Sequence, residues 1–207
     1  MKSRWWCWSC LVLVSGALAG CLSLEKRYPE KRYFALSASR PGPAPAAPFD
    51  GVLAVRPLRI SPAYAGSEFV YRTGDVTLES DFYNEFFIPP SRLVTEEVRR
   101  WFEESGLFRT VVDSAGPIES THVLEGAVQA IYGEYRPAGL PRAAIEVQFF
   151  LLAATGEEVK VLLQKSFSRK VDVPDDTPEA LVRGWNRALG EILAELEGEV
   201  REALSGG

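Results

Sequence analysis

The stretch AAIEVQFFLLAATGEEVKVLLQKSF, residues 143–167, carries the clearest strand pattern in the chain. Apolar side chains recur at alternate positions on both sides of a turn-like Thr155-Gly156-Glu157. Such alternation is typical of strands with one buried face, and a Gly-containing turn between two such runs predicts a hairpin. The residues expected to face the core are Ile145, Val147, Phe149 and Leu151 on the first arm, and Val159, Val161, Leu163 and Phe167 on the second. Both arms are long, which favours antiparallel pairing.

Two amphipathic helices are predicted to cover the sheet. The first lies in residues 88–108, with Ser91 as the expected N-cap and Gly106 as a left-handed C-terminal stop. The second follows Thr177, an expected N-cap with Pro178 at the first helical position. Its apolar stripe consists of Leu181, Trp185, Leu189, Ile192, Leu196 and Val200.

The remaining strands are predicted from shorter apolar runs. They fall at residues 33–37, in 51–60 and 68–80, at 108–112, and at 121–135. In the last run, alternation assigns one face to Leu124, Val128, Ala130 and Tyr132. Together these patterns predict an α+β fold, with a mostly antiparallel or mixed β-sheet and two main α-helices packed on it.

The first twenty residues have the layout of an export signal. Lys2 and Arg4 precede an apolar run, residues 5–19, that ends in small residues. The run is shorter than the ~20 residues that a bilayer-spanning helix requires. A cleaved signal peptide is therefore preferred over a retained membrane anchor.

Leu18, Ala19, Gly20 and Cys21 resemble the lipobox of bacterial lipoproteins at all four positions. In that class the cysteine thiol is acylated and the chain is cut before it, so Cys21 is the predicted lipidation site and new N-terminus. Several acyl chains would hold a protein on a membrane far more firmly than one. The residue after the cysteine is Leu22 rather than aspartate, which by the same resemblance favours the periplasmic leaflet of the outer membrane.

Three segments are predicted along the chain. Residues 1–20 form a lipoprotein signal peptide, residues 21–32 a lipidated N-terminus and flexible tether, and residues 33–204 a single domain. Removal of residues 1–20 takes away Lys2 and Arg4 and no acidic residue, which changes the net charge from −5 to −7. A chain this acidic is a poor partner for nucleic acid.

Catalytic and metal-binding patterns are missing from the sequence. His122 is the only histidine, and after processing Cys21 is the only cysteine, so no zinc site can be completed. Neither a G-x-S-x-G elbow nor a phosphate-binding glycine loop occurs. His122 is expected to be a half-buried strand residue. We therefore expect no catalytic residue, no metal and no cofactor.

An aromatic cluster precedes the first helix, in ESDFYNEFFIPP, residues 79–90. If this stretch is a strand, alternation sends Phe82 and Phe86 to one side, and Tyr83 and Phe87 to the other. Two interpretations stay open. The strand packs on both faces, or some of these rings form an exposed rim that contacts a partner or a lipid chain.

The order of motifs resembles the ABC-type transport auxiliary lipoproteins, over roughly residues 33–200. The residues that carry the resemblance are VRPLRI at 55–60, FVYR at 69–72, FYNEFFIPP at 82–90 and SGLFRTV at 105–111. Many members of that family have a tryptophan in the strand before the first helix, where this chain has Phe86 or Phe87.

The resemblance implies a non-enzymatic, lipid-anchored periplasmic protein. Its expected partners are the membrane, an MCE-type (mammalian-cell-entry) protein and an ABC permease, which together move phospholipid or another hydrophobic molecule. A lipid ligand is a further implied partner. The main alternative is a lipoprotein adaptor that activates a cell-envelope enzyme such as a cell-wall synthase, and an enzyme is the third hypothesis. Exposed strand edges would also allow homo-oligomers.

Overall fold

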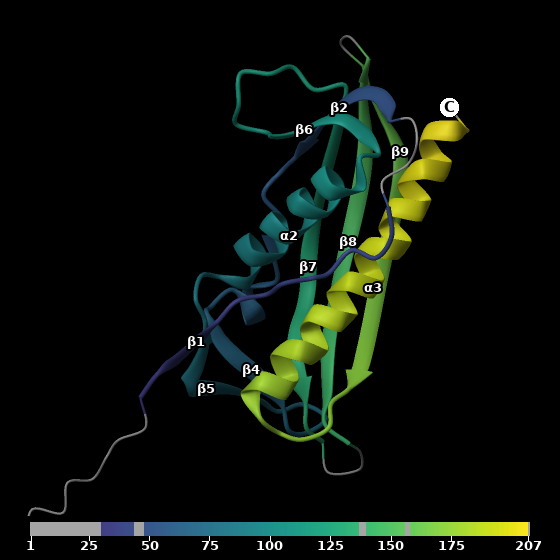
Figure 1. Ribbon diagram of the computed structural model, residues 1–207. Coiled ribbons are helices and arrows are strands. Elements are labelled where there is room, and N and C mark those ends of the chain that lie inside the picture. The colour runs from purple at the N-terminus through teal and green to yellow at the C-terminus, as the bar shows by residue number, and fades with distance from the viewer. Residues whose placement is uncertain (1–29, 44–47, 137–139, 156–157, 207) are drawn as a thin grey trace, which may run out of the picture. The chain divides into compact units, whose positions relative to one another are not determined.

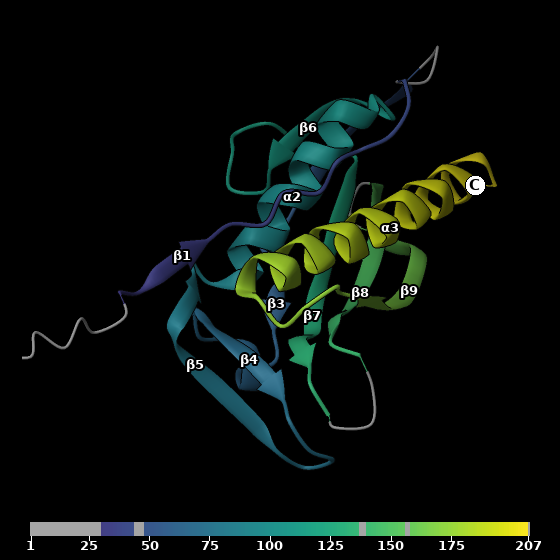
Figure 2. The same cartoon turned by 60° about the horizontal axis from the view of Figure 1, so that its bottom comes forward.

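The computed structural model describes residues 30–43, 48–136, 140–155 and 158–206. The predicted signal peptide, Leu18, Ala19, Gly20 and the lipidation site Cys21 lie outside these residues, as do Gly156 and Glu157 of the predicted turn. The chain from Lys31 onward forms one compact unit, which Figures 1 and 2 show from two sides.

The described residues form one mixed sheet of nine strands. The strands are β1 Arg32–Phe34, β2 Phe49–Val55, β3 Arg59–Ile60, β4 Glu68–Arg72, β5 Leu78–Phe86, β6 Phe108–Asp113, β7 His122–Glu134, β8 Arg142–Thr155 and β9 Glu158–Asp172. Two long helices, α2 Pro90–Ser105 and α3 Pro178–Ser205, pack against it, and η2 Pro62–Tyr64 is a short 3-10 turn. The predicted α+β class is confirmed.

Strand β7 is the centre of the sheet. One of its edges pairs antiparallel with β8 along nearly its whole length. The other edge pairs in turn with β2, β3 and β4, all parallel to it. Beyond β4 come β5 and then β1, so in this half the order is β9-β8-β7-β4-β5-β1. Strands β1 and β9 are therefore at opposite edges.

The predicted β8–β9 hairpin is present, but half of the assigned face on β9 is wrong. The four core residues of the first arm are fully buried, as expected. Val159 and Val161 are instead 67% and 54% exposed. The register explains the difference, because Leu151 pairs with Leu163 whereas Leu152 pairs with Val161, which leaves Leu162 as an extra residue. One extra residue moves all following side chains to the other face.

The same effect corrects the prediction for β7. Leu124 and Val128 lie in the main core as expected, but the register shifts between Val128 and Ala130. After this bulge Ile131 faces the main core. Ala130 and Tyr132 lie instead in a second buried cluster with Ala144.

Of the three helix ends predicted from the sequence, two agree with the structure. The hydroxyl of Thr177 accepts a hydrogen bond from the Ala180 N–H at 3.2 Å, with Pro178 in the first turn of α3. Gly106 ends α2 with φ of 61°, a conformation that favours glycine. The Ser91 cap is wrong, because α2 already begins at Pro90, whose ring leaves one N–H fewer to cap.

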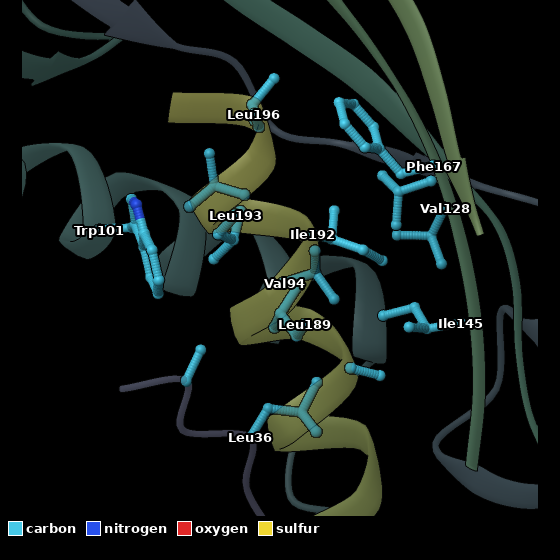
Figure 3. Close-up of a cluster of buried hydrophobic side chains, with 14 of the residues drawn as sticks. Leu36, Val94, Trp101, Val128, Ile145, Phe167, Leu189, Ile192, Leu193 and Leu196 are labelled. Carbon is cyan, nitrogen blue, oxygen red and sulfur yellow. The ribbon is translucent and has the colours of Figure 1, made fainter. Parts of the chain in front are cut away.

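The main core lies between the sheet and the two helices. Figure 3 shows side chains of α3 meeting Val128, Ile145 and Phe167 of the sheet, with Val94 and Trp101 of α2 close by. Its largest buried side chain, Trp185, donates its indole N–H to the carbonyl oxygens of Tyr132 and Ala144, both at 3.2 Å. The core thus holds the indole by both packing and hydrogen bonds.

The chain after β1 crosses the molecule as an extended segment between α2 and α3 (Figures 1 and 2). We call residues 35–42 the strap. Leu36 and Ala38 are buried in the core, while Ser37 and Ser39 are exposed. The strand predicted at residues 33–37 ends at Phe34, because the next backbone donors bond to helix side chains rather than to a strand.

Two buried glutamates hold the strap. The Ala38 N–H donates to Glu97 of α2 at 2.6 Å. The Arg40 guanidinium donates twice to Glu197 of α3, with both bonds 2.9 Å long. Trp101 of α2 donates its indole N–H to the same carboxylate at 3.0 Å. Glu197 therefore joins the strap and both helices.

The protonation of Glu197 is coupled to folding. Burial raises the pKa of this carboxyl, but the hydrogen bonds and charges of Arg40, Trp101 and Arg201 lower it more, so the pKa lies below its ordinary value of 4.5. A carboxyl with a lowered folded-state pKa contributes stability above its unfolded value, and this contribution is lost as the pH falls through the folded pKa.

We predict that Glu197→Gln lowers the free energy of unfolding by about 3 kcal/mol at neutral pH, because Arg40 is left buried without a counter-charge. The difference in the free energy of unfolding between the variant and the wild type should shrink as the pH falls from 4.5 through the lowered folded-state pKa of Glu197. Urea unfolding across this pH range measures both effects. The control Glu199→Gln, in a half-exposed pair with Lys165, should cost less than about 1 kcal/mol. Equal losses for the two variants would contradict the role of Glu197.

Candidate functional site

The candidate site is built around a wide bulge in β5. Glu68 of β4 pairs with Glu85, and Val70 pairs with Ser80. Two steps along β4 thus correspond to five along β5, and the ladder is interrupted between these pairs. Such bulges redirect side chains and are frequent near functional surfaces.

Asp81 fixes the shape of this bulge. Its Oδ1 accepts hydrogen bonds from the backbone N–H groups of Tyr83, at 2.7 Å, and Asn84, at 3.0 Å. Its Oδ2 accepts from the Tyr71 hydroxyl and from the Asn84 side-chain amide, both at 2.6 Å. Burial raises the pKa of the Asp81 carboxyl, but these hydrogen bonds lower it more, so it lies below its ordinary value.

On the outer side of the bulge, exposed rings gather along β1 and β5. We define the aromatic patch as Tyr33, Phe82, Tyr83 and Phe87, together with Lys31. Phe82 and Phe87 are 68% and 73% exposed, and Tyr33 is 57% exposed. Large apolar side chains with this exposure, gathered on one surface, indicate an interaction site.

The rings of the patch form two pairs. The rings of Tyr33 and Phe87 lie edge to face with centroids 6.4 Å apart, and those of Phe82 and Tyr83 do so at 5.1 Å. The Lys31 ammonium lies 4.9 Å from the centroid of the Phe82 ring and also pairs with Glu85. Lys31 thus contacts the second ring pair, and its partner Glu85 lies opposite Tyr33 of the first pair in the β1–β5 register.

Phe86 does not belong to this patch. It is 2% exposed and packs against Phe69 and Trp185, with ring centroids 4.7 and 5.2 Å away. The strand thus packs into the core through Phe86, while Phe82, Tyr83 and Phe87 are exposed. Phe82 and Phe86 differ in exposure because the ladder is interrupted at the bulge just before Phe86.

The inner side of the bulge borders a polar cavity of about 350 Å³. Its lining consists of Arg32, Tyr71, Thr73, Asp81, Asn84, Tyr135, Asp176 and Pro178. Arg32 donates to the Asn84 amide oxygen at 3.0 Å and to Glu179 at 2.8 Å. Burial raises the pKa of Tyr135 to about 12, so both cavity tyrosines are neutral hydroxyls at physiological pH.

A second exposed apolar group lies at the opposite edge of the sheet. Val159 and Val161, the β9 valine pair, are carried outward by the bulge at Leu162. Because Val161 pairs with Leu152, the pair faces away from the side of Leu151 and the main core. The sheet thus presents one exposed apolar group at each edge.

His122, the histidine that the sequence offered as a possible catalytic or metal-binding residue, has a structural role. His122 is buried rather than half-buried, with its Nδ1 2.9 Å from the Thr121 hydroxyl and its ring against Phe49 and Phe108. Burial lowers the pKa of His122. The described part of the chain contains no group of three or more His, Cys, Asp or Glu residues positioned to hold a metal ion.

Sequence reasoning missed Lys31 and Tyr33 as members of the patch. Their pairing with β5 brings together residues about fifty positions apart, and no local pattern reports such a contact. Within the described ranges, no helix is both long and apolar enough to cross a bilayer.

Comparisons with known proteins identify the fold. No family model matches the sequence, and no curated protein gives a significant match. Protein XCC0632 from Xanthomonas campestris, of the DUF330 family, superimposes with a TM-score of 0.72 at 21% identity, over 83% of this chain and 96% of its own. An uncharacterized protein gives 0.60 at 17%, over 83% and 99%. The CT253 protein from Chlamydia trachomatis gives 0.52 at 12%, over 77% and 100%. At these identities the likeness shows the fold alone.

We predict that Asp81→Ala lowers the free energy of unfolding by about 2 kcal/mol, because the Tyr71 hydroxyl and the Asn84 amide lose their buried acceptor. Chemical denaturation measures this change. The matched control is Asp50→Ala, which breaks a highly exposed pair with Arg109 and should change stability by less than about 1 kcal/mol. A bulge that tolerates Asp81→Ala as well as the control would not depend on this carboxylate.

Proposed function

We propose that this protein is a lipid-anchored, non-enzymatic component of an ABC/MCE-type transport system of the cell envelope. Acyl chains on Cys21 hold it at the periplasmic leaflet of the outer membrane. Its folded unit docks partner proteins, an MCE-type protein and an ABC permease, that move phospholipid or another hydrophobic molecule between membranes.

The observation that carries this proposal is the pair of exposed apolar groups on opposite edges of one sheet. The aromatic patch lies at the β1 edge and the β9 valine pair at the other. A protein that connects two bodies needs two separate contact surfaces. Bulges expose Phe82 and Tyr83 of the first group and both valines of the second, and bulges of this kind are retained features of folds rather than defects.

The sequence supplies the second line of support. The four positions Leu18 to Cys21 resemble the lipobox. Two of the four motifs that resemble the transport auxiliary lipoproteins lie near the patch: FVYR is in β4, and FYNEFFIPP covers part of the bulge and the start of α2. The proposal assigns the β9 valine pair to protein docking. The adaptor of a cell-wall synthase would use the same anchored design with a different partner.

The anchor is tested on the protein purified from its native membrane. We expect the mature chain to begin at Cys21 and to carry the mass of acyl chains, as measured by intact-protein mass spectrometry. A Cys21→Ser variant should lack that mass and be lost from the outer-membrane fraction. Native protein that begins with Met1 and carries no acyl chain would contradict the anchor.

Docking is tested by site-specific photo-crosslinking in cells that express the MCE-type protein and permease of the same genome. A photoreactive residue in place of Val161 should crosslink to the MCE-type protein or the permease. The matched control replaces Val76, which is 97% exposed in the segment between β4 and β5. Crosslinks to a cell-wall synthase would support the adaptor hypothesis instead. Equal, weak labelling at both positions would contradict docking through β9.

A further inference from the structure

The aromatic patch lies where the folded unit begins. Lys31 is the first residue of the compact unit, and both Lys31 and Tyr33 belong to the patch. Ten peptide steps separate Lys31 from Cys21, which allows a reach of at most about 35 Å. If Cys21 is acylated, the patch can never move far from the bilayer surface.

The short tether makes the bilayer the partner that the aromatic patch meets at the highest effective concentration. A surface linked to its target by a short flexible segment meets that target at an effective concentration in the millimolar range. Weak contacts are then sufficient, and a small patch of four rings fits this requirement. The patch of an anchored protein would meet lipid headgroups before it met a freely diffusing protein.

The side chains have the chemistry of a membrane interface. Phe82 and Phe87 are mostly exposed and purely apolar, while Tyr33 and Tyr83 combine a ring with a hydroxyl. Aromatic side chains with a polar end are enriched at the boundary between headgroups and acyl chains, and lysine stems can lie along the same layer. The patch therefore matches the polarity gradient of that boundary.

The charges favour a neutral surface rather than an anionic one. Lys31 is paired with Glu85, and Arg32 is paired with Glu179. The predicted mature chain is also acidic. Attraction to anionic lipids would require uncompensated basic residues, so contact here has to come from the insertion of rings.

We propose that the aromatic patch rests on the bilayer, with Phe82 and Phe87 inserted at the headgroup–acyl boundary and the β1 edge toward the membrane. The β9 valine pair, at the opposite edge, then faces away from the lipid. This inference rests on the proposed anchor, and it adds a defined orientation that the anchor alone does not require.

The test uses the full chain, processed and acylated, in vesicles of phosphatidylethanolamine with a minor share of phosphatidylglycerol. Cys7 and Cys10 leave with the signal peptide and the Cys21 thiol is blocked by acylation, so an introduced cysteine is the only reactive thiol. An environment-sensitive fluorophore is attached at Phe87→Cys, or at the control Val161→Cys. Brominated lipids then quench a fluorophore that lies in the membrane.

Quenching should be about threefold stronger at position 87 than at 161, because interfacial groups lie about 5–10 Å deep. The double variant Phe82→Ser/Tyr83→Ser should reduce the quenching at 87. The matched double variant Val159→Ser/Val161→Ser should leave it unchanged. All five substituted positions carry exposed side chains, so thermal unfolding should stay close to that of the wild type.

The outcomes separate the two proposals. If the protein floats with vesicles but the brominated lipids quench the fluorophore at neither 87 nor 161, the proposed orientation is wrong and the proposed anchor stands. If the protein carries no acyl chain and does not float, both are wrong. Quenching at 161 as strong as at 87 would show an unoriented protein and would also overturn the inference.

Discussion

The contact between Arg40 and Glu197 is the interaction on which the arrangement of the strap and the two helices depends. A buried carboxylate is costly unless it is paired and hydrogen-bonded, and Glu197 satisfies this requirement with donors from the strap, α2 and α3. The strap fills the space between the helices only because these donors are in place. A segment that precedes the first long strand in sequence is in this way an integral part of the core.

The position of the strap has a mechanical consequence for an anchored protein. Any pull from the predicted acyl chains would reach the fold first at β1, whose three residues pair with β5. The load would then pass to the strap, which is held by the Ser37 N–H bonded to Asn186 at 2.9 Å and by the two glutamates. Because both glutamates are buried and belong to different helices, the strap is fixed to the body of the fold.

Three bulges decide which side chains of their strands are exposed or buried. The β5 bulge presents Phe82 and Tyr83, the β9 bulge presents Val159 and Val161, and the β7 bulge moves Tyr132 to the second cluster. Each inserts extra residues into a strand and so reverses which side chains face the core. The strand register therefore decides that Phe82, Tyr83, Val159 and Val161 are exposed. The sheet has one candidate contact surface at each edge.

The sequence by itself determined the α+β class, the β8–β9 hairpin, both helices and the caps at Thr177 and Gly106, because these depend on local periodicity and on the backbone preferences of single residues. It also contains the lipobox-like motif at Cys21, which is a linear signal. Only the tertiary structure decided that Phe86 is buried while Phe82 and Phe87 are exposed, and that Lys31 and Tyr33 join them. Alternation predicts which face of a sheet a side chain lies on only while the strand register is unbroken. The pairing of β1 with β5 joins residues about fifty positions apart, and no local sequence pattern encodes such a contact.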